Sequence, residues 1–279
     1  MKAKFLAVAV AAAASFVAAP AIGLELFNVD NPTGVTFTGF DWAQGGTAYT
    51  TGFQPATGDT FTLTYFAWAV TVQNGNNPIP NANMVGLDNN ANGVANGTYE
   101  YTVVATVNET VDSCTGLGTT GSCTFSITGG TFNIYYDTSP DANATTGTGY
   151  TDGTSIVSGD LFGPDTTFTT SLVGGVPSGQ AIATLFGTNL VTDTNFIKPA
   201  VTGATSSTTL QLGSAQTNGY VAPTGFNGSP LPGSPDVIFQ ADGNSSFTAT
   251  PTVPEPATLA LLGLGLGAMG WTTIRRKRS

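Results

Sequence analysis

Hydrophobic and polar residues alternate along three long segments of the chain, which are Thr60–Val72, Tyr99–Val111 and Thr124–Tyr136. This period of two residues is typical of β-strands that bury one face. In the first segment Phe61, Leu63 and Tyr65 fall on one face, while threonines fall on the other. The alternation becomes less regular near Phe66, which predicts either a bulge or deeper burial there.

Shorter segments of the same kind predict further strands: Val35–Phe40, Ser155–Leu161, Thr166–Val173, Phe196–Val201, Thr208–Leu212, Val237–Gln240 and Ser246–Thr250. Gly, Pro, Asn and Asp separate these segments, and no segment between the two ends of the chain shows a sustained helical period. About ten strands joined by turns favour an all-β fold. We expect an antiparallel β-sandwich or jelly-roll-like body over residues 22–247.

The first 21 residues have the pattern of a signal peptide. Lys2 and Lys4 precede an apolar run, Phe5–Ala18, and Ala19 and Ala21 supply the small residues of a cleavage site. We therefore expect a signal helix in the precursor, export through the Sec machinery and cleavage by signal peptidase after Ala21. A membrane anchor or a buried helix is the alternative interpretation.

The C-terminal end combines three features in a fixed order. Pro254, Glu255 and Pro256 precede an uncharged, largely apolar run over 257–274, which is followed by Arg275, Arg276, Lys277 and Arg278. A helix of that length spans about 27 Å, enough to cross the hydrocarbon core of a bilayer. The basic tail predicts a cytoplasmic C-terminus, which places the body outside the inner membrane. Residues 248–253 form the expected linker, and 254–279 the sorting segment.

This arrangement resembles the PEP-CTERM sorting signal. The resemblance implies that Pro254, Glu255 and Pro256 are recognised by an exosortase, a membrane protease-transferase of bacteria that make extracellular polysaccharide, and that the tail is removed. The protein would contact the inner membrane only transiently. A plain single-span anchor is the alternative.

The charges between the two ends are almost all negative. The chain has no histidine, and in the body, residues 22–247, 16 acidic residues accompany one basic residue, Lys198. This charge disfavours nucleic-acid binding, because phosphate recognition needs positive charge, and we expect no nucleic-acid partner. Catalysis that needs imidazole is excluded, because the chain has no histidine.

Cys114 and Cys123 are the only cysteines, and the residues between them form a Gly/Thr-rich loop between two predicted strands. In an exported protein this spacing predicts a disulfide that closes a hairpin. A redox-active pair is the alternative, but no neighbouring cation is available to activate a thiol.

Asp88, Asn90 and Asn92 are weak candidates for a calcium site. Together with Gly93 they resemble the first half of an EF-hand loop, but the twelfth position is Tyr99 instead of a bidentate glutamate. An Asn/Gly-rich turn is the other interpretation, and the segment Asp137–Asn143 is a similar turn. We expect no cofactor beyond loosely bound Ca²⁺.

Neither the acidic nor the aromatic residues form a recognisable active site. No pair of carboxylates stands out as a hydrolytic site. Four aromatic residues could stack on sugars if exposed but are more typical of a core: Trp42, Trp68, Tyr135 and Tyr136.

Four short sequence segments of the body, in order along the chain, resemble flocculation-associated PEP-CTERM proteins of the PepA type: residues 26–30, 134–138, 147–154 and 239–247. The resemblance implies a non-enzymatic protein of the cell surface or the extracellular polysaccharide matrix that promotes floc or biofilm formation, and it supplies no catalytic residues. A secreted carbohydrate-binding module is the alternative, and a secreted glycan hydrolase comes third.

Overall fold

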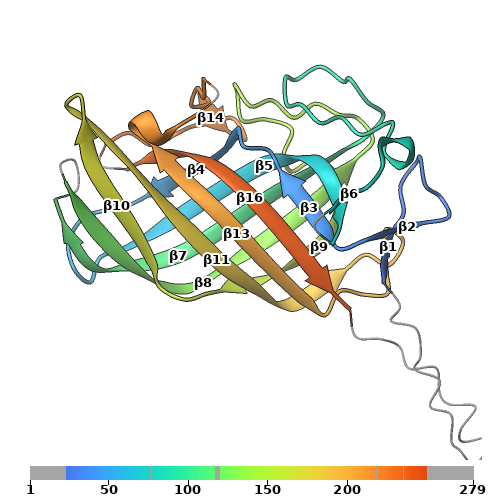
Figure 1. Ribbon diagram of the computed structural model, residues 1–279, viewed down its shortest axis with the longest axis horizontal. Helices are drawn as coiled ribbons and strands as arrows, with labels where there is room; N and C mark the ends of the chain where they lie inside the picture. Colours follow the sequence, from blue (N-terminus) through green and yellow to red (C-terminus); the bar gives the residue numbers. More distant parts are fainter. Residues whose placement is uncertain (1–22, 76, 117–119, 218, 235, 250–279) are drawn as a thin grey trace, which may run out of the picture. The chain divides into compact units, whose positions relative to one another are not determined.

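The long alternating segments form one closed antiparallel sheet in the computed structural model, which describes residues 23–249 except 76, 117–119, 218 and 235 (Figure 1). The strands of this sheet that form the barrel wall are β3 (Gly39–Trp42), β4 (Gly46–Thr51), β5 (Thr60–Asn74), β7 (Glu100–Thr115), β8 (Gly121–Asp137), β9 (Thr154–Phe162), β10 (Thr166–Val173), β11 (Val176–Thr192), β13 (Gly203–Leu212) and β16 (Ile238–Thr248).

These strands occupy eight positions around a barrel. β3 and β4 share one position, because both pair with β5 on one side and with β16 on the other. β9 and β10 likewise share the position between β8 and β11. That shared position closes the ring.

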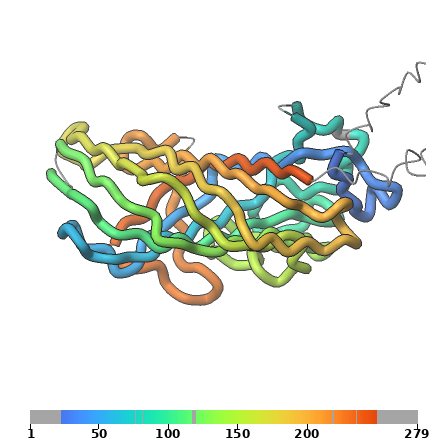
Figure 2. Tube along the Cα trace, turned by 90° about the horizontal axis from the view of Figure 1, so that it is seen from below, coloured from blue at the N-terminus to red at the C-terminus, as the bar shows by residue number. Residues whose placement is uncertain are grey.

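The predicted sandwich or jelly roll therefore gives way to a single closed barrel. Two packed sheets would leave open edges, whereas here the pairings of β8 with β9 and β10 satisfy the last edge. The strands are long enough to wind around the barrel, since β8 and β11 each have 17 residues. In Figure 2 the neighbouring strands run side by side along the barrel, and the orange segment between β13 and β16 projects below it.

The inward positions carry the hydrophobic core. In β5 Phe61, Leu63 and Tyr65 are buried at alternate positions, as the sequence predicts, and they belong to the largest core cluster. Near the middle of the barrel the rings of Phe40 and Trp42 stack with their centroids 5.1 Å apart. The side-chain period of two thus sorts each strand into an inner apolar face and an outer, more polar one.

Phe66 explains the irregular part of the first segment. β5 pairs with β7 without a break from Thr60 to Trp68, so the strand has no bulge at Phe66, and its register against β3 shifts only further on, between Ala69 and Thr71. Phe66 instead faces outward and is buried beneath Tyr150 and Phe226, whose ring centroids lie 4.8 and 4.6 Å from its own. Deeper burial, one of the two predicted explanations, is correct.

A small sheet made of β1 (Leu24–Leu26), β2 (Val35–Phe37) and β12 (Ile197–Lys198) covers the barrel end at which β16 finishes (Figure 1). Phe37 packs there against Phe247 of β16, with ring centroids 6.3 Å apart. Leu26, Phe37 and Ile197 are fully buried, so this end of the barrel is filled.

The remaining described elements are short: β6 (Asn77–Pro78), β14 (Gly225–Phe226), β15 (Ser229–Pro230) and the 3₁₀ turns η1 (Asn81–Asn83) and η2 (Gly213–Ala215). The predicted signal helix over 1–21 and the predicted transmembrane helix over 257–274 lie outside the described residues. Within the part of the chain that the structure describes, no helix has the length and apolar character needed to cross a bilayer.

Candidate functional site

A cavity of about 380 Å³ lies inside the barrel, at the end opposite the small sheet. Five phenylalanine rings from five parts of the chain contribute to its wall: Phe53, Phe61, Phe125, Phe168 and Phe239. Neighbouring rings meet edge to face, at centroid distances of 5.1 Å for Phe53–Phe61 and 5.2 Å for both Phe61–Phe125 and Phe168–Phe239. Such contacts hold the rings in place around the space between them.

Glu109 of β7 brings a carboxyl group into this apolar wall. It pairs with Phe61 of β5 and therefore lies on the same inward face. Its side chain is 5 % exposed and makes no hydrogen bond with the described residues. Burial raises the pKa of Glu109 from 4.5 to about 7, because the low-dielectric surroundings disfavour the charged form.

A second acid, Asp236, lies at the rim of the cavity and is fixed there by hydrogen bonds. Its carboxylate accepts from the Phe53 backbone N–H at 2.8 Å and from Thr50 Oγ1 at 3.2 Å. The Val237 backbone N–H in turn donates to Thr50 Oγ1 at 2.8 Å. The rim thus joins the loop after β4 to the segment that enters β16.

Sequence reasoning did not single out Glu109, although the sequence carried a signal for it. Within the predicted strand Tyr99–Val111, Glu109 has the same parity as Val103 and Val107, which point inward. A carboxylate on the apolar face of a strand is unusual unless it has a partner or a ligand. The strand period alone therefore marked it.

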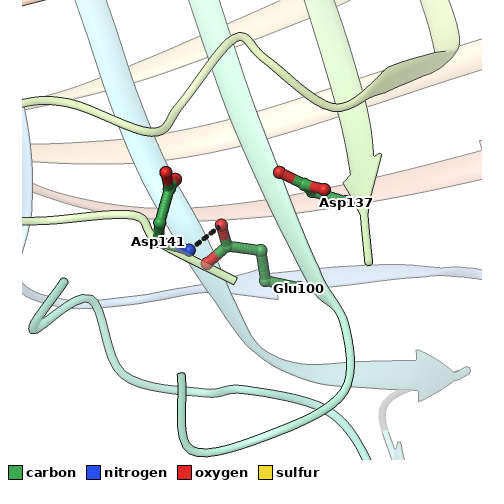
Figure 3. Close-up of side chains that lie close together, drawn as sticks. All are labelled: Glu100, Asp137 and Asp141. Carbon is green, nitrogen blue, oxygen red and sulfur yellow. Dashed lines mark hydrogen bonds between the residues drawn. The ribbon is translucent and has the colours of Figure 1, made fainter. Parts of the chain in front are cut away.

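Three other carboxylates meet near the opposite end of β7 and β8 (Figure 3). Carboxylate oxygens of Glu100, Asp137 and Asp141 all lie within 4.8 Å of one another. Glu100 Oε1 accepts hydrogen bonds from the backbone N–H groups of Asp141 and Ala142, at 3.0 and 3.1 Å. Three hard oxygen ligands suit a cation such as Ca²⁺.

Burial raises the pKa of Glu100 to about 7, against the lowering effect of those two hydrogen bonds, and the negative charges of Asp141 and Asp137 raise it further. Burial and the charges of Asp152 and Asp137 also raise the pKa of Asp141. The sequence predicts a turn that contains Asp137 and Asp141, but it does not show that Glu100 lies beside this turn. Counting back along the hairpin from the Cys114–Cys123 pair brings Glu100 opposite Asp137.

The predicted calcium candidates lie in a turn stabilised by their own hydrogen bonds. Asp88 is buried, and its two carboxylate oxygens accept from the backbone N–H groups of Asn90 and Asn96 at 3.1 and 2.7 Å. Asn92 Oδ1 accepts from the Val94 N–H at 2.8 Å. The structure thus shows the turn, and calcium binding at Asp88, Asn90 and Asn92 stays a prediction.

The four aromatic residues considered for sugar stacking are all buried or half-buried. Trp42 and Tyr136 are buried, and Trp42 donates its indole N–H to Ser245 Oγ at 3.1 Å. Trp68 is half-buried and donates to the Asn89 carbonyl at 3.0 Å, and Tyr135 is half-buried. They do not form a shared exposed platform.

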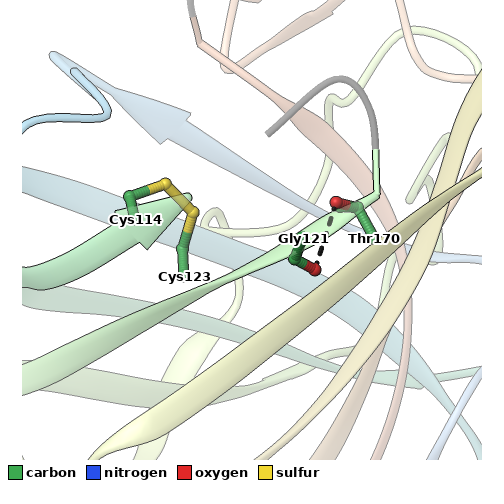
Figure 4. Close-up of a disulfide and its surroundings, with 4 residues drawn as sticks. All are labelled: Cys114, Gly121, Cys123 and Thr170. Carbon is green, nitrogen blue, oxygen red and sulfur yellow. Dashed lines mark hydrogen bonds between the residues drawn. A yellow bond between two sulfur atoms is a disulfide. The ribbon is translucent and has the colours of Figure 1, made fainter. Parts of the chain in front are cut away.

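The predicted disulfide between Cys114 and Cys123 is present (Figure 4). It joins the end of β7 to the start of β8, at the cavity end of the barrel. Cys123 also pairs with Phe168 of β10, and Thr170 Oγ1 donates to the Gly121 carbonyl at 3.4 Å. The disulfide therefore lies beside the seam at which the barrel closes.

The described residues thus define a closed all-β barrel with an internal cavity at one end. Residues 252–278 match the PEP-CTERM protein-sorting motif. Neither the search of curated proteins nor the comparison with solved structures finds a significant match for the chain.

The motif indicates an exported surface protein that an exosortase processes. It covers the predicted recognition residues Pro254, Glu255 and Pro256 and the basic tail, all of which lie outside the described residues, as do Ala19 and Ala21. No relative supports the resemblance of the body to flocculation-associated proteins.

Proposed function

We propose that this protein is a non-enzymatic component of the cell surface or of the extracellular polysaccharide matrix, where it promotes floc or biofilm formation after exosortase processing. The observation that carries the proposal is the sorting motif at residues 252–278. The signal-peptide pattern of residues 1–21 supports it, because it accounts for the first step of export.

The charge of the body suggests how such a protein would hold a matrix together. Sixteen acidic residues accompany one lysine, so divalent cations can bridge the protein to acidic polysaccharide. The outer face of β10 adds hydroxyl groups, since Thr167, Thr169 and Ser171 are exposed. Many weak contacts of this kind give strong combined attachment.

The two buried glutamates with raised pKa values are too far apart to act together on one glycosidic bond. Glu100 and Glu109, whose pKa values burial raises to about 7, lie nine residues apart on β7, on the order of 30 Å along the strand. Hydrolysis of a glycosidic bond needs two carboxyl groups within roughly 5–10 Å on either side of a cleft. The cluster of Glu100, Asp137 and Asp141 does not line the barrel cavity.

The experiment replaces Pro254, Glu255 and Pro256 by alanine in the full chain and compares it with wild type in a deletion strain. Wild type should be processed, reach the surface and restore flocs, and flocs should disperse when a chelator removes Ca²⁺ and Mg²⁺. The variant should remain unprocessed and restore nothing. Normal flocculation of the deletion strain would disprove the matrix role, whereas normal processing of the variant would disprove recognition of the motif.

A further inference from the structure

Glu109 is a buried acid for which the protein body provides no counter-charge. The residue is 5 % exposed, it lines the cavity beside the phenylalanines, and its carboxyl makes no hydrogen bond with the described residues. The only basic residue of the body is Lys198, which lies on β12, in the small sheet at the other end of the barrel. An unpaired buried carboxylate is costly, so a group from outside the chain is the natural partner.

The space beside Glu109 is large enough for such a partner. Its volume of about 380 Å³ falls within the range of roughly 300–1,000 Å³ typical of small-molecule sites. A barrel of eight strands is either filled by its own side chains or holds one small ligand. In this barrel, side chains fill the small-sheet end, whereas the Glu109 end leaves room for a small ligand.

The chemistry of the wall selects the ligand. The π faces of phenylalanine rings attract cations, and a carboxylate pairs with an ammonium group by a charge-assisted hydrogen bond. From this geometry we infer that the cavity binds a small apolar amine, whose ammonium group pairs with Glu109 while its hydrocarbon part packs among Phe61, Phe125 and Phe168. The inference concerns the barrel alone and does not depend on the proposed matrix role.

Other ligand classes fit the wall less well. A carboxylic acid would be repelled by Glu109 and by Asp236 at the rim. A neutral alcohol of the same size fills the apolar space but leaves a charged Glu109 without a counter-charge. A sugar would place part of its hydroxyl groups against the phenylalanine rings, away from the hydroxyl side chains of Thr50, Thr166 and Thr170.

The test uses three probes that share one ring and differ in the head group: phenethylamine, 2-phenylethanol and phenylacetate. Binding to the processed protein, recovered from the cells that export it, is measured by titration calorimetry at pH 8 in 0.15 M NaCl, which screens the acidic exterior. Phenethylamine should bind with one site per chain and at least tenfold more tightly than the alcohol. Phenylacetate should not bind.

Two variants test whether the probes bind in the cavity beside Glu109. Glu109→Gln should weaken phenethylamine at least tenfold and leave 2-phenylethanol unchanged, and Ala181→Phe, which fills the cavity from β11, should abolish both. Glu25→Gln removes an exposed glutamate at the other end and serves as the matched control. Circular dichroism and thermal unfolding confirm that each variant is folded.

The affinity for phenethylamine should rise between pH 5.5 and 8, because Glu109 must lose its proton to pair with ammonium. Asp236 is the only other ionisable side chain that lines the cavity among the described residues, so no basic group opposes this trend. Equal binding of amine and alcohol, amine binding unchanged by Glu109→Gln or Ala181→Phe, or no binding of any probe would each overturn the inference.

Discussion

Glu109 shows how one residue can link the stability of the barrel to pH. Its pKa is about 7 in the folded protein and 4.5 ordinarily, because the barrel wall disfavours the carboxylate. Between these two values the folded state binds more protons than the unfolded state. The free energy of unfolding therefore falls as the pH rises through this window and stays low above it.

Replacing Glu109 by glutamine should remove this part of the pH dependence. The variant should gain stability over wild type progressively from pH 4.5 to 7.5, by up to about 3 kcal/mol, since each unit of pKa shift corresponds to about 1.4 kcal/mol. Urea unfolding at a series of pH values measures the difference. Glu25→Gln, an exposed change, is the control, and a constant difference between Glu109→Gln and wild type would contradict the assignment.

Gly243 is a second residue whose role depends on close packing. A Cβ atom at this position of β16 would lie 2.6 Å from the Tyr65 hydroxyl oxygen and 3.4 Å from Trp42 Cδ1. The Tyr65 hydroxyl is buried and has no hydrogen-bond partner among the residues that the structure describes. Glycine at 243 therefore makes room for a tyrosine ring in the middle of the barrel.

Gly243→Ala should destabilise the protein by about 1–3 kcal/mol, as overpacking of a core generally does. Tyr65→Phe should cost little, because it removes an unpaired hydroxyl group, and it should relieve much of the effect of Gly243→Ala. Chemical unfolding of the two single variants and the double variant measures this coupling. Additive effects would show that the two residues do not compete for the same space.

At the scale of elements, the β7–β8 hairpin connects the disulfide to the closure of the barrel. Cys114 and Cys123 are nine residues apart, and β8 continues directly into its pairing with β10. The bond restricts the unfolded chain locally. It also holds the first residues of β8 beside the strand that completes the ring.

Replacing both cysteines by serine should lower the free energy of unfolding by about 2–3 kcal/mol, the value expected for a loop of this length. Thermal unfolding with and without reductant measures the effect, and reduced wild type should behave like the double variant. Reductant should leave the double variant unchanged. A reduced wild type as stable as the oxidised form would contradict a stabilising role for the bond.

The strands that the sequence predicted well are those with uninterrupted alternation. β5, β7 and β8 fall within a few residues of the predicted segments, and β10 has the predicted bounds, Thr166–Val173. The period of two residues is sufficient there because one face of each strand is buried in the barrel.

The missed elements contain residues that usually end strands. β11 was not predicted, because Pro177, Gly179 and Gly187 interrupt its alternation, and Asn189 adopts a positive φ of 48° at an irregularity in its pairing. β16 was predicted as two segments because Asp242–Asn244 has the composition of a turn. Gly243 instead serves packing against Tyr65, which only the tertiary structure reveals.

At the scale of the whole molecule, the closed ring depends on contacts that no local pattern encodes. The alternation predicts strands and burial, but whether the sheet folds into two layers or closes depends on which strands pair last. Here the shared position of β9 and β10 between β8 and β11 decides it. The cavity follows from this closure, since its wall combines strands from across the chain, and for that reason the sequence did not predict it.

The sorting motif acts on the same whole-molecule scale, because it determines where the barrel is delivered. The sequence pattern alone predicted this motif, and the match at residues 252–278 confirms it. A short linear signal is read by a membrane enzyme and does not require the fold of the body. The sequence alone is therefore sufficient to recognise it.

Mass spectrometry of the protein recovered from the cell surface tests the central claim most directly, because it identifies both ends of the mature chain at once. We predict a chain that begins after Ala21, lacks the tail from the Pro254–Pro256 region onward and retains the Cys114–Cys123 disulfide. Recovery of the protein only inside the cell, at full length and with both ends intact, would contradict the account.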